Sequence, residues 1–213
     1  MQKFWTLLLA LTITFTGFSQ RKSKDDAPAW TTANTSAFKF RDIGPATTSG
    51  RIADLAVNPE NKAEMYLALA SGGVWKTSNN GTTWQPIFEH ENSYSTGCIE
   101  IDPNNTNTIW VGTGENNNQR SVAYGDGVYV SRDGGKSWTN TGLESSEHIG
   151  MIAIDPRNSD HVYIAAYGPL WNKGGERGIY ETTDGGKNWT RILEVSEHTG
   201  FNEIHMDPRN PDV

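Results

Sequence analysis

Charged, aromatic and histidine side chains gather in the irregular segments of this sequence, between runs of alternating apolar residues. Two of these segments are long for a compact protein, residues 115–127 and 168–177, and loops of that length are usually functional or disordered. Their carboxylates, arginines and tryptophan could hold a sugar or a peptide. The candidates for a ligand-binding face are Arg51, Glu115, Asn116, Arg120, Asp126, His148, Trp171, Glu176, Arg177 and His198.

Each candidate also has a structural interpretation that stays open. Glu115, Arg120 and Asp126 could form a loop bonded to itself, and Trp171 could stack on a sugar ring or cover the mouth of a channel. A Glu-His pair recurs as 147–148 and 197–198, which could suit a metal or an inter-blade hydrogen bond. Neither pair has the His-x-x-x-His or Cys spacing of metal sites, and Cys98 is the only cysteine. The sequence therefore predicts no metal and no cofactor.

Four Asn/Asp-Pro dipeptides show the elements that must position these residues. They lie at 58–59, 102–103, 155–156 and 207–208, and each ends an alternating apolar run that a glycine introduces. Alternation with a period of two that ends at Asp-Pro predicts a strand entering a turn, because proline cannot donate to a sheet and presets the turn.

Further strands follow each turn. Residues 65–69, 108–112 and 161–166 are rich in β-branched and aromatic types, and third runs start at Gly73, Gly127 and Gly178. A tight turn and a fourth strand follow each third run. Four antiparallel strands per unit of about 40 to 55 residues indicate the blades of a β-propeller, an all-β fold.

The turn between the third and fourth strands carries the most specific pattern. It resembles the Asp box, or BNR repeat, with the spacing Ser/Thr-x-Asp-x-Gly-x-Thr-Trp. The residues that match the pattern are Thr77, Asn79, Gly81, Trp84, Ser131, Asp133, Gly135, Trp138, Thr182, Asp184, Gly186 and Trp189.

We expect the chemistry of this pattern to be structural. The Asp or Asn side chain accepts hydrogen bonds from its own turn, the glycines allow positive φ, and the tryptophan fills the space between blades. A carboxylate repeated in each blade favours a turn-forming over a catalytic role for Asp133 and Asp184. Asn79 at the same position of the first copy agrees, because an amide cannot act as a general base.

The domain organisation follows from these repeats. Residues 1–20 read as a signal peptide, with Lys3 before an apolar run that is too short and too threonine-rich for a membrane span. Residues 21–37 read as a flexible lead-in, and 38–213 as a partial propeller. Its blades cover about 50–88, 97–143 and 150–194, and 200–213 begin a fourth. We expect a fragment of a longer chain, since propellers close with at least four blades.

The strand order also predicts which face to search. Consecutive strands alternate direction, so the Asp boxes lie on one face and the blade-to-blade and second-to-third connections lie on the other. The net charge of −7 disfavours a nucleic-acid partner. Secretion or a periplasmic or cell-surface location follows from the signal peptide.

Residues 40–213 resemble the sortilin-type BNR propellers, especially large secreted bacterial proteins labelled as glycosyl hydrolases. The segments that carry the resemblance are 41–45, 70–77 and 112–117. It implies a ring of many blades, and leaves two functions open. The first is a scaffold that binds a peptide or carbohydrate, as sortilin-like propellers capture peptides. The alternative is a glycoside hydrolase of the xyloglucan-cleaving two-propeller type.

The hydrolase alternative has a gap at the position where those enzymes carry an early acid. The comparable segment here, residues 68–73, reads Ala-Leu-Ala-Ser-Gly-Gly and holds none, so the acids would lie partly outside this sequence. The arginine triad of sialidases also has no clear counterpart. From sequence, enzymatic activity and catalytic residues stay undetermined.

Overall fold

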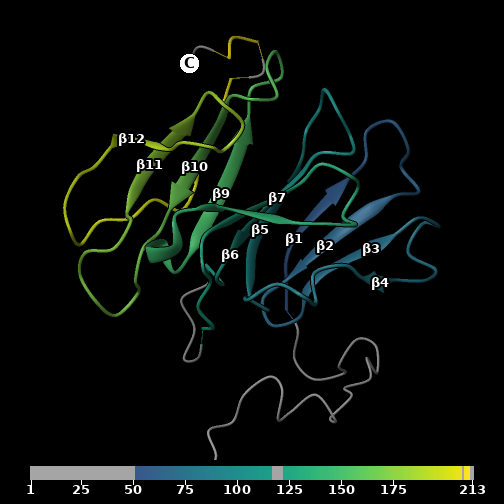
Figure 1. Cartoon of the computed structure of the whole chain (residues 1–213), viewed down its shortest axis with the longest axis horizontal. Coiled ribbons are helices and arrows are strands. Elements are labelled where there is room, and N and C mark those ends of the chain that lie inside the picture. The colour runs from purple at the N-terminus through teal and green to yellow at the C-terminus, as the bar shows by residue number, and fades with distance from the viewer. Residues whose placement is uncertain (1–50, 117–121, 208, 212–213) are drawn as a thin grey trace, which may run out of the picture. The chain divides into compact units, whose positions relative to one another are not determined.

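The computed structural model describes residues 51–116, 122–207 and 209–211, all within the unit Ile43–Val213. These residues form three four-stranded antiparallel sheets, each in simple sequential order (Figure 1). The strands are β1 (Ile52–Val57), β2 (Met65–Leu69), β3 (Gly73–Thr77) and β4 (Gln85–Pro86) in the first blade, β5 (Thr96–Ile101), β6 (Ile109–Thr113), β7 (Val128–Ser131) and β8 (Thr139–Gly142) in the second, and β9 (Ile149–Ile154), β10 (Val162–Ala166), β11 (Gly178–Thr182) and β12 (Thr190–Leu193) in the third.

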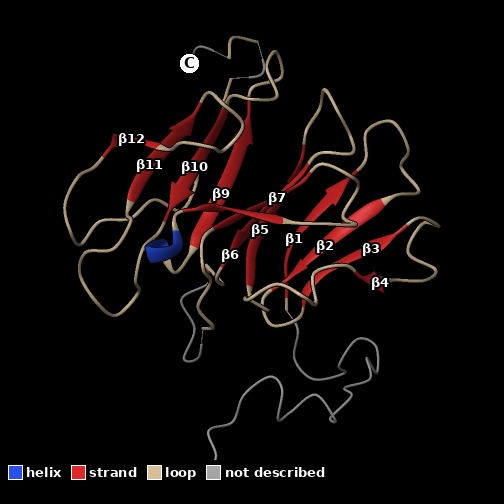
Figure 2. Ribbon diagram, viewed as in Figure 1, coloured by secondary structure: helices blue, strands red, loops and turns tan. Residues whose placement is uncertain are grey.

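The expected all-β fold is confirmed, and the described part of the chain is a partial β-propeller. One 3-10 turn, η2 (Glu144–Ser146), is the only helical segment among the described residues (Figure 2). The strand expected over 201–206 is a correction, because the structure assigns no strand there. The Phe201 N–H donates to the Ala166 carbonyl at 3.1 Å, but no described strand pairs with this segment. One hydrogen bond is not a ladder of paired residues, so this segment is not a strand.

The Asn/Asp-Pro turns form because the side chain replaces a backbone acceptor. In each turn the Oδ1 atom of the Asn or Asp accepts the N–H of the residue two positions later, at 2.8 to 2.9 Å. The residues that accept in this way are Asn58, Asp102, Asp155 and Asp207. In the three blades these Asx turns end the first strand at the same place and so set the register of the next strand.

The apolar cores lie between blades. An aromatic ring at the second position of the second strand is fully buried in the first two blades, as Tyr66 and Trp110. The equivalent Tyr163 in the third blade is only partly buried. On the other side of the blades, Leu55 is 49% exposed, whereas its equivalents Ile99 and Ile152 are 2% and 3% exposed. Each blade therefore offers one apolar face to the blade before it and one to the blade after it.

Tryptophans of the Asp-box turns join neighbouring blades. Trp138 of the second blade donates its Nε1–H to the Ile87 carbonyl of the first blade at 2.7 Å. Trp189 of the third blade donates in the same way to the Thr141 carbonyl of the second at 2.9 Å. In both cases the ring also packs edge-on against a buried aromatic ring of the blade before it. Because the same contact joins the first blade to the second and the second to the third, it belongs to the repeated packing of neighbouring blades.

Glycines let the first strands of adjacent blades approach closely. A Cβ added at Gly97 would lie 2.4 Å from the Ile149 carbonyl oxygen, and one at Gly150 would lie 2.4 Å from the Asn202 carbonyl oxygen. No side chain fits at such distances, which explains why a glycine stands at the start of the first strand in the second and third blades. The described part of the chain holds no helix long and apolar enough to cross a membrane.

Candidate functional site

The connections expected on one face do lie together. Backbone hydrogen bonds join each second-to-third connection to a blade-to-blade connection: Gly114 N–H to the Ser95 carbonyl at 2.9 Å, and Tyr167 N–H to the His148 carbonyl at 2.9 Å. We call this surface, made of residues 87–95, 114–116, 122–127, 143–148, 167–177 and 194–200, the connection face. The Asp-box turns lie beside the Asx turns instead, as Gly134 N–H donates to the Asn107 carbonyl at 2.9 Å.

Arg51 and Glu115 form an ion pair between the first two blades. The Arg51 Nε–H donates to Glu115 Oε1 at 2.7 Å, and the Nη2 group bonds the second oxygen. The Glu115 side chain is fully buried, while that of Arg51 is 45% exposed. Both carboxylate oxygens are thus engaged by one guanidinium, a geometry that fixes the loop. Glu115, expected as a ligand-binding candidate, is not open to a ligand in this arrangement.

Asp126 closes the same loop from its other end. Its carboxylate accepts the Tyr129 hydroxyl at 2.6 Å, and its backbone N–H donates to Thr113 Oγ1 at 2.8 Å. Burial and the hydrogen bond to Asp126 raise the pKa of Tyr129 to about 12. The charge of Asp126 also acts on Glu91, whose pKa is raised first by burial and further by that charge. Glu91 lies in the first blade-to-blade connection, outside the repeated motifs, and no sequence signal singles it out.

The two Glu-His pairs differ in the structure. His148 is fully buried and packs against Tyr124, with ring centroids 5.6 Å apart. Neither of its ring nitrogens bonds a described residue, and burial lowers the pKa of His148. His198, by contrast, has a side chain that is 69% exposed. The expected inter-blade hydrogen bonding runs through the backbone, for example from the Gly125 N–H to the Glu147 carbonyl at 2.8 Å.

Arg177 organises the connection from 167 to 177. Its side chain is buried, with 6% of the residue exposed, and it donates to four backbone carbonyls of its own loop. The Gly174 carbonyl accepts from Nε at 2.8 Å and the Tyr167 carbonyl from Nη1 at 3.0 Å, while the other two acceptors are Pro169 and Asn172. Because a guanidinium has five donors in a fixed fork, these bonds set the shape of the loop.

A hollow lies beside this loop. Its volume is about 650 Å³, and its walls come from Tyr167, residues 169–173, Arg177 and residues 198–200. Trp171 is 63% exposed and stands at its edge. Lys173 Nζ pairs with Glu197 at 3.2 Å, which links the loop to the last blade-to-blade connection. The structure thus brings together Trp171, Arg177 and His198 of the expected candidates.

The remaining candidates occupy separate places. Asn116 donates from Nδ2 to the Gly150 carbonyl at 3.1 Å, and Glu176 accepts the Ser145 N–H at 2.8 Å. Arg120 lies outside the described residues. Within the described ranges, no group of three or more His, Cys, Asp or Glu side chains is placed to hold a metal ion.

The Asp-box turns use their polar groups internally. In the third copy, Asp184 accepts the Asn188 N–H at 3.0 Å, the Asn188 amide at 2.7 Å and the Thr182 hydroxyl at 2.8 Å. These bonds, chiefly those from Asn188, lower the pKa of Asp184 to about 2. Asp133 has the equivalent bonds and a lowered pKa, while Asn79 accepts the Thr83 N–H at 2.9 Å.

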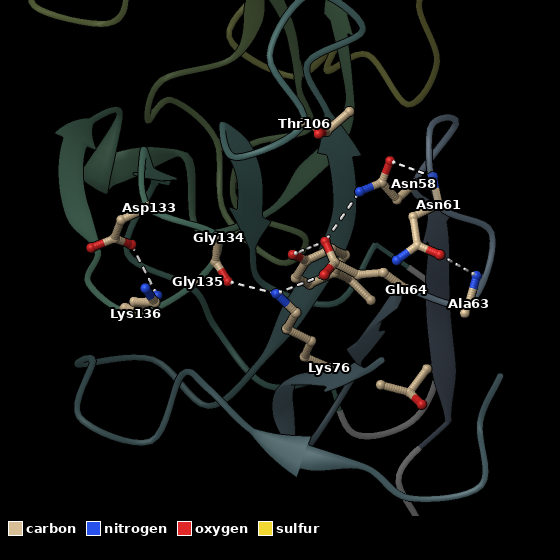
Figure 3. A network of polar contacts seen from close by, with 12 residues as sticks. Asn58, Asn61, Ala63, Glu64, Lys76, Thr106, Asp133, Gly134, Gly135 and Lys136 are labelled. Carbon is tan, nitrogen blue, oxygen red and sulfur yellow. Dashed lines mark hydrogen bonds and ion pairs between the residues drawn. The ribbon is translucent and has the colours of Figure 1, made fainter. Parts of the chain in front are cut away.

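Figure 3 shows how such a turn contacts the blade before it. The Lys76 ammonium of the first blade pairs with Glu64 at 3.1 Å and donates to the Gly134 carbonyl of the second at 3.2 Å (Figure 3). Arg132 donates to the Gly185 carbonyl of the third blade at 2.8 Å. The same carbonyl of successive Asp-box turns therefore serves as an acceptor from the preceding blade.

Comparisons with known proteins relate this β-propeller to the GH74 xyloglucanases. A probable oligoxyloglucan-reducing end-specific xyloglucanase of Neosartorya fischeri is 20% identical over 98% of this chain. The oligoxyloglucan-reducing end-specific xyloglucanase of Emericella nidulans is 28% identical over 62% of it. The crystal structure of an ancestral GH74 enzyme matches 68% of the chain with a TM-score of 0.54 at 26% identity. No model of a known protein family matches the chain.

The likeness covers a minor part of these proteins. The chain spans 25% and 16% of the two curated relatives, and 18% of the ancestral enzyme. The expected relation to xyloglucan-cleaving propellers is thereby supported at the level of fold and distant sequence likeness. The sortilin and BNR resemblance stays a prediction.

Proposed function

We propose that this chain is part of a secreted β-propeller glycoside hydrolase that acts on xyloglucan or a related β-glucan. The supporting observation is that curated xyloglucanases match the chain over most of its length. A scaffold that binds carbohydrate without cleaving it is the second candidate. The hollow beside the exposed Trp171 supports the scaffold as much as the hydrolase, because binding a glycan there needs no catalytic acid.

In this proposal the connection face is the glycan side of the molecule. Arg51, Glu115 and Arg177 are held by bonds within the protein and would shape the loops. Trp171, Lys173 and His198 stand exposed around the hollow and would contact the glycan. Inverting hydrolysis needs two carboxylates about 6.5 to 9.5 Å apart. Residues 68–73 offer no acid, so the proposal leaves the catalytic acids unassigned.

Secretion is part of the proposal, since a polysaccharide is met outside the cell. Residues 1–20 would be removed as a signal peptide; they lie outside the described residues. Amino-terminal sequencing of the protein recovered from the medium or periplasm tests this. A mature amino terminus near residue 21 is expected, and retention of Met1 would contradict it.

The test of function is a reducing-end assay of the complete product of the reading frame on a panel of soluble plant polysaccharides. Release of reducing ends from xyloglucan, but not from mannan or starch, is expected. The Asp126→Asn variant should keep this activity, because Asp126 holds a loop in place and is not proposed as a catalytic acid. Binding without release would favour the scaffold, and neither binding nor release would overturn both candidates.

A further inference from the structure

The loop that carries Trp171 is built to hold its shape. The four carbonyls bonded by Arg177 come from both sides of Trp171, at 167, 169, 172 and 174. Gly168 has a φ of +78°, and an added Cβ would lie 2.2 Å from Arg177 Cγ, so the backbone packs directly on that side chain. The backbone that carries the indole is therefore held by the fold before any ligand arrives.

Holding an exposed indole in a fixed place has no evident role in stability. Of the tryptophans in the Asp-box turns, Trp138 and Trp189 are partly buried and hydrogen bonded to the neighbouring blade. Trp171 is 63% exposed instead, and the four Arg177 bonds that hold its loop do not involve the indole. A large apolar side chain that a rigid loop presents to water beside a hollow is typical of a binding site.

We propose that the hollow beside Trp171 is a binding subsite for a neutral sugar ring, which stacks on the indole. This inference rests on the proposed action on glycans and names the residues that make the contact. The apolar face of a pyranose packs on an indole, while the sugar hydroxyls need both donors and acceptors nearby. His198 and Lys173 supply donors, and the Glu197 carboxylate supplies an acceptor.

The charges around the hollow select a neutral ligand over an acidic one. The Arg177 guanidinium is already used by four carbonyls, and the Lys173 ammonium is paired with Glu197 at 3.2 Å. A uronic acid or an acidic peptide would have to compete with these partners and would take the Lys173 ammonium from Glu197. Neutral hydroxyl groups can join the Lys173–Glu197 pair without breaking it. A volume of about 650 Å³ lies in the range of ligand sites.

The test compares two equally exposed aromatic residues of the connection face. Trp171 and Tyr94 are each 63% exposed. Affinity gel electrophoresis of the full chain in soluble xyloglucan should show a loss on the order of tenfold in affinity for Trp171→Ala. Trp171→Phe should recover part of it, and Tyr94→Ala should bind like the wild type. Equal melting temperatures of the variants confirm that folding is intact.

A second measurement identifies the ring in contact. Binding of xyloglucan oligosaccharides should perturb the indole absorption of the wild type, and Trp171→Phe should abolish this difference spectrum. A polygalacturonate of similar length should give no such change, and acidic peptides should give none.

The outcomes separate this subsite from the proposed function. Unchanged affinity of Trp171→Ala, or an equal loss in Tyr94→Ala, overturns the subsite even if reducing ends are released from xyloglucan. Tighter binding of polygalacturonate or of an acidic peptide overturns the neutral-sugar assignment. If the wild type binds no glycan, the subsite proposal is wrong. The reducing-end assay then remains as the test of the proposed hydrolase activity.

Discussion

The Asp-box turns and the connection face differ in whether their hydrogen bonds repeat from blade to blade. The three turns repeat one set of bonds. A Ser or Thr hydroxyl donates to the Oδ1 atom of the Asp or Asn, and the N–H four residues later donates to the same oxygen. On the connection face the bonds do not repeat. Arg51 pairs with Glu115 in one place, Arg177 bonds four carbonyls in another, and the buried His148 ring packs against Tyr124 without a bond from either ring nitrogen to a described residue. Repetition marks what every blade needs, and its absence marks where a specific function could reside.

The largest effect is expected on the connection face, at Arg177. Replacing it by methionine leaves four carbonyls of the loop without their donor, which should cost about 3 kcal/mol of unfolding free energy. The melting temperature should then fall by roughly 6 to 12 °C. Arg191→Met is the control, because the Arg191 side chain is 39% exposed and pairs with Glu194 at the surface. Equal losses in the two variants would show that the Arg177 bonds add no stability.

The next effect separates two tryptophans of the Asp-box turns. Trp138 bonds the Ile87 carbonyl, whereas no described residue accepts from the Trp84 indole. Trp138→Phe should therefore cost about 1 kcal/mol more than Trp84→Phe, the value of one hydrogen bond between blades. Urea denaturation at constant m measures the difference. If the two costs are the same, the inter-blade bond does not contribute and the repeated contact is packing alone.

Acid should act on the second and third turns and spare the first. The pKa of Asp184 is about 2 in the folded chain, below its ordinary 3.8, chiefly because of its bonds to Asn188. A lowered folded-state pKa means that this stabilisation is present above about pH 4 and is lost as the pH falls toward 2. Asp133 behaves in the same direction, and Asn79 cannot titrate.

Melting temperatures from pH 6 to pH 2 test this. The double variant Asp133→Asn, Asp184→Asn should lose less stability on acidification than the wild type, and Asn79→Asp should lose more. Parallel curves for all three proteins would show that the turn carboxylates do not carry the acid sensitivity.

The smallest effect is a gain at an Asx turn. Asp155 is bonded at both oxygens by Arg157 two residues later, at 3.0 and 2.8 Å. Asp102 is followed at that position by Asn104, and its Oδ2 is buried without a partner among the described residues. Asn104→Arg should add about 0.5 kcal/mol, since the Arg157 side chain is half exposed and such pairs are weak. The gain should vanish in the Asp102→Asn background, and a gain that persists there would come from another contact.

Much of the fold could be predicted from single residues. The alternation that ends at Asn58, Asp102 and Asp155 places strands whose observed ends agree within about two residues. Those signals are local, because an Asx turn and a period of two act over a few residues. The segment 201–206 has the same signals but no strand, since pairing depends on a neighbour that local sequence does not supply.

The sequence by itself determined the four-stranded blades, the Asp-box turns and the division of the connections between two faces. Only the tertiary structure decided which candidates of the connection face are open. It buried Glu115 against Arg51, gave Arg177 to the carbonyls of its own loop, and left Trp171 exposed at a hollow. The reason is physical: a turn is set by bonds between residues a few positions apart, whereas exposure depends on loops from different blades that meet only after folding.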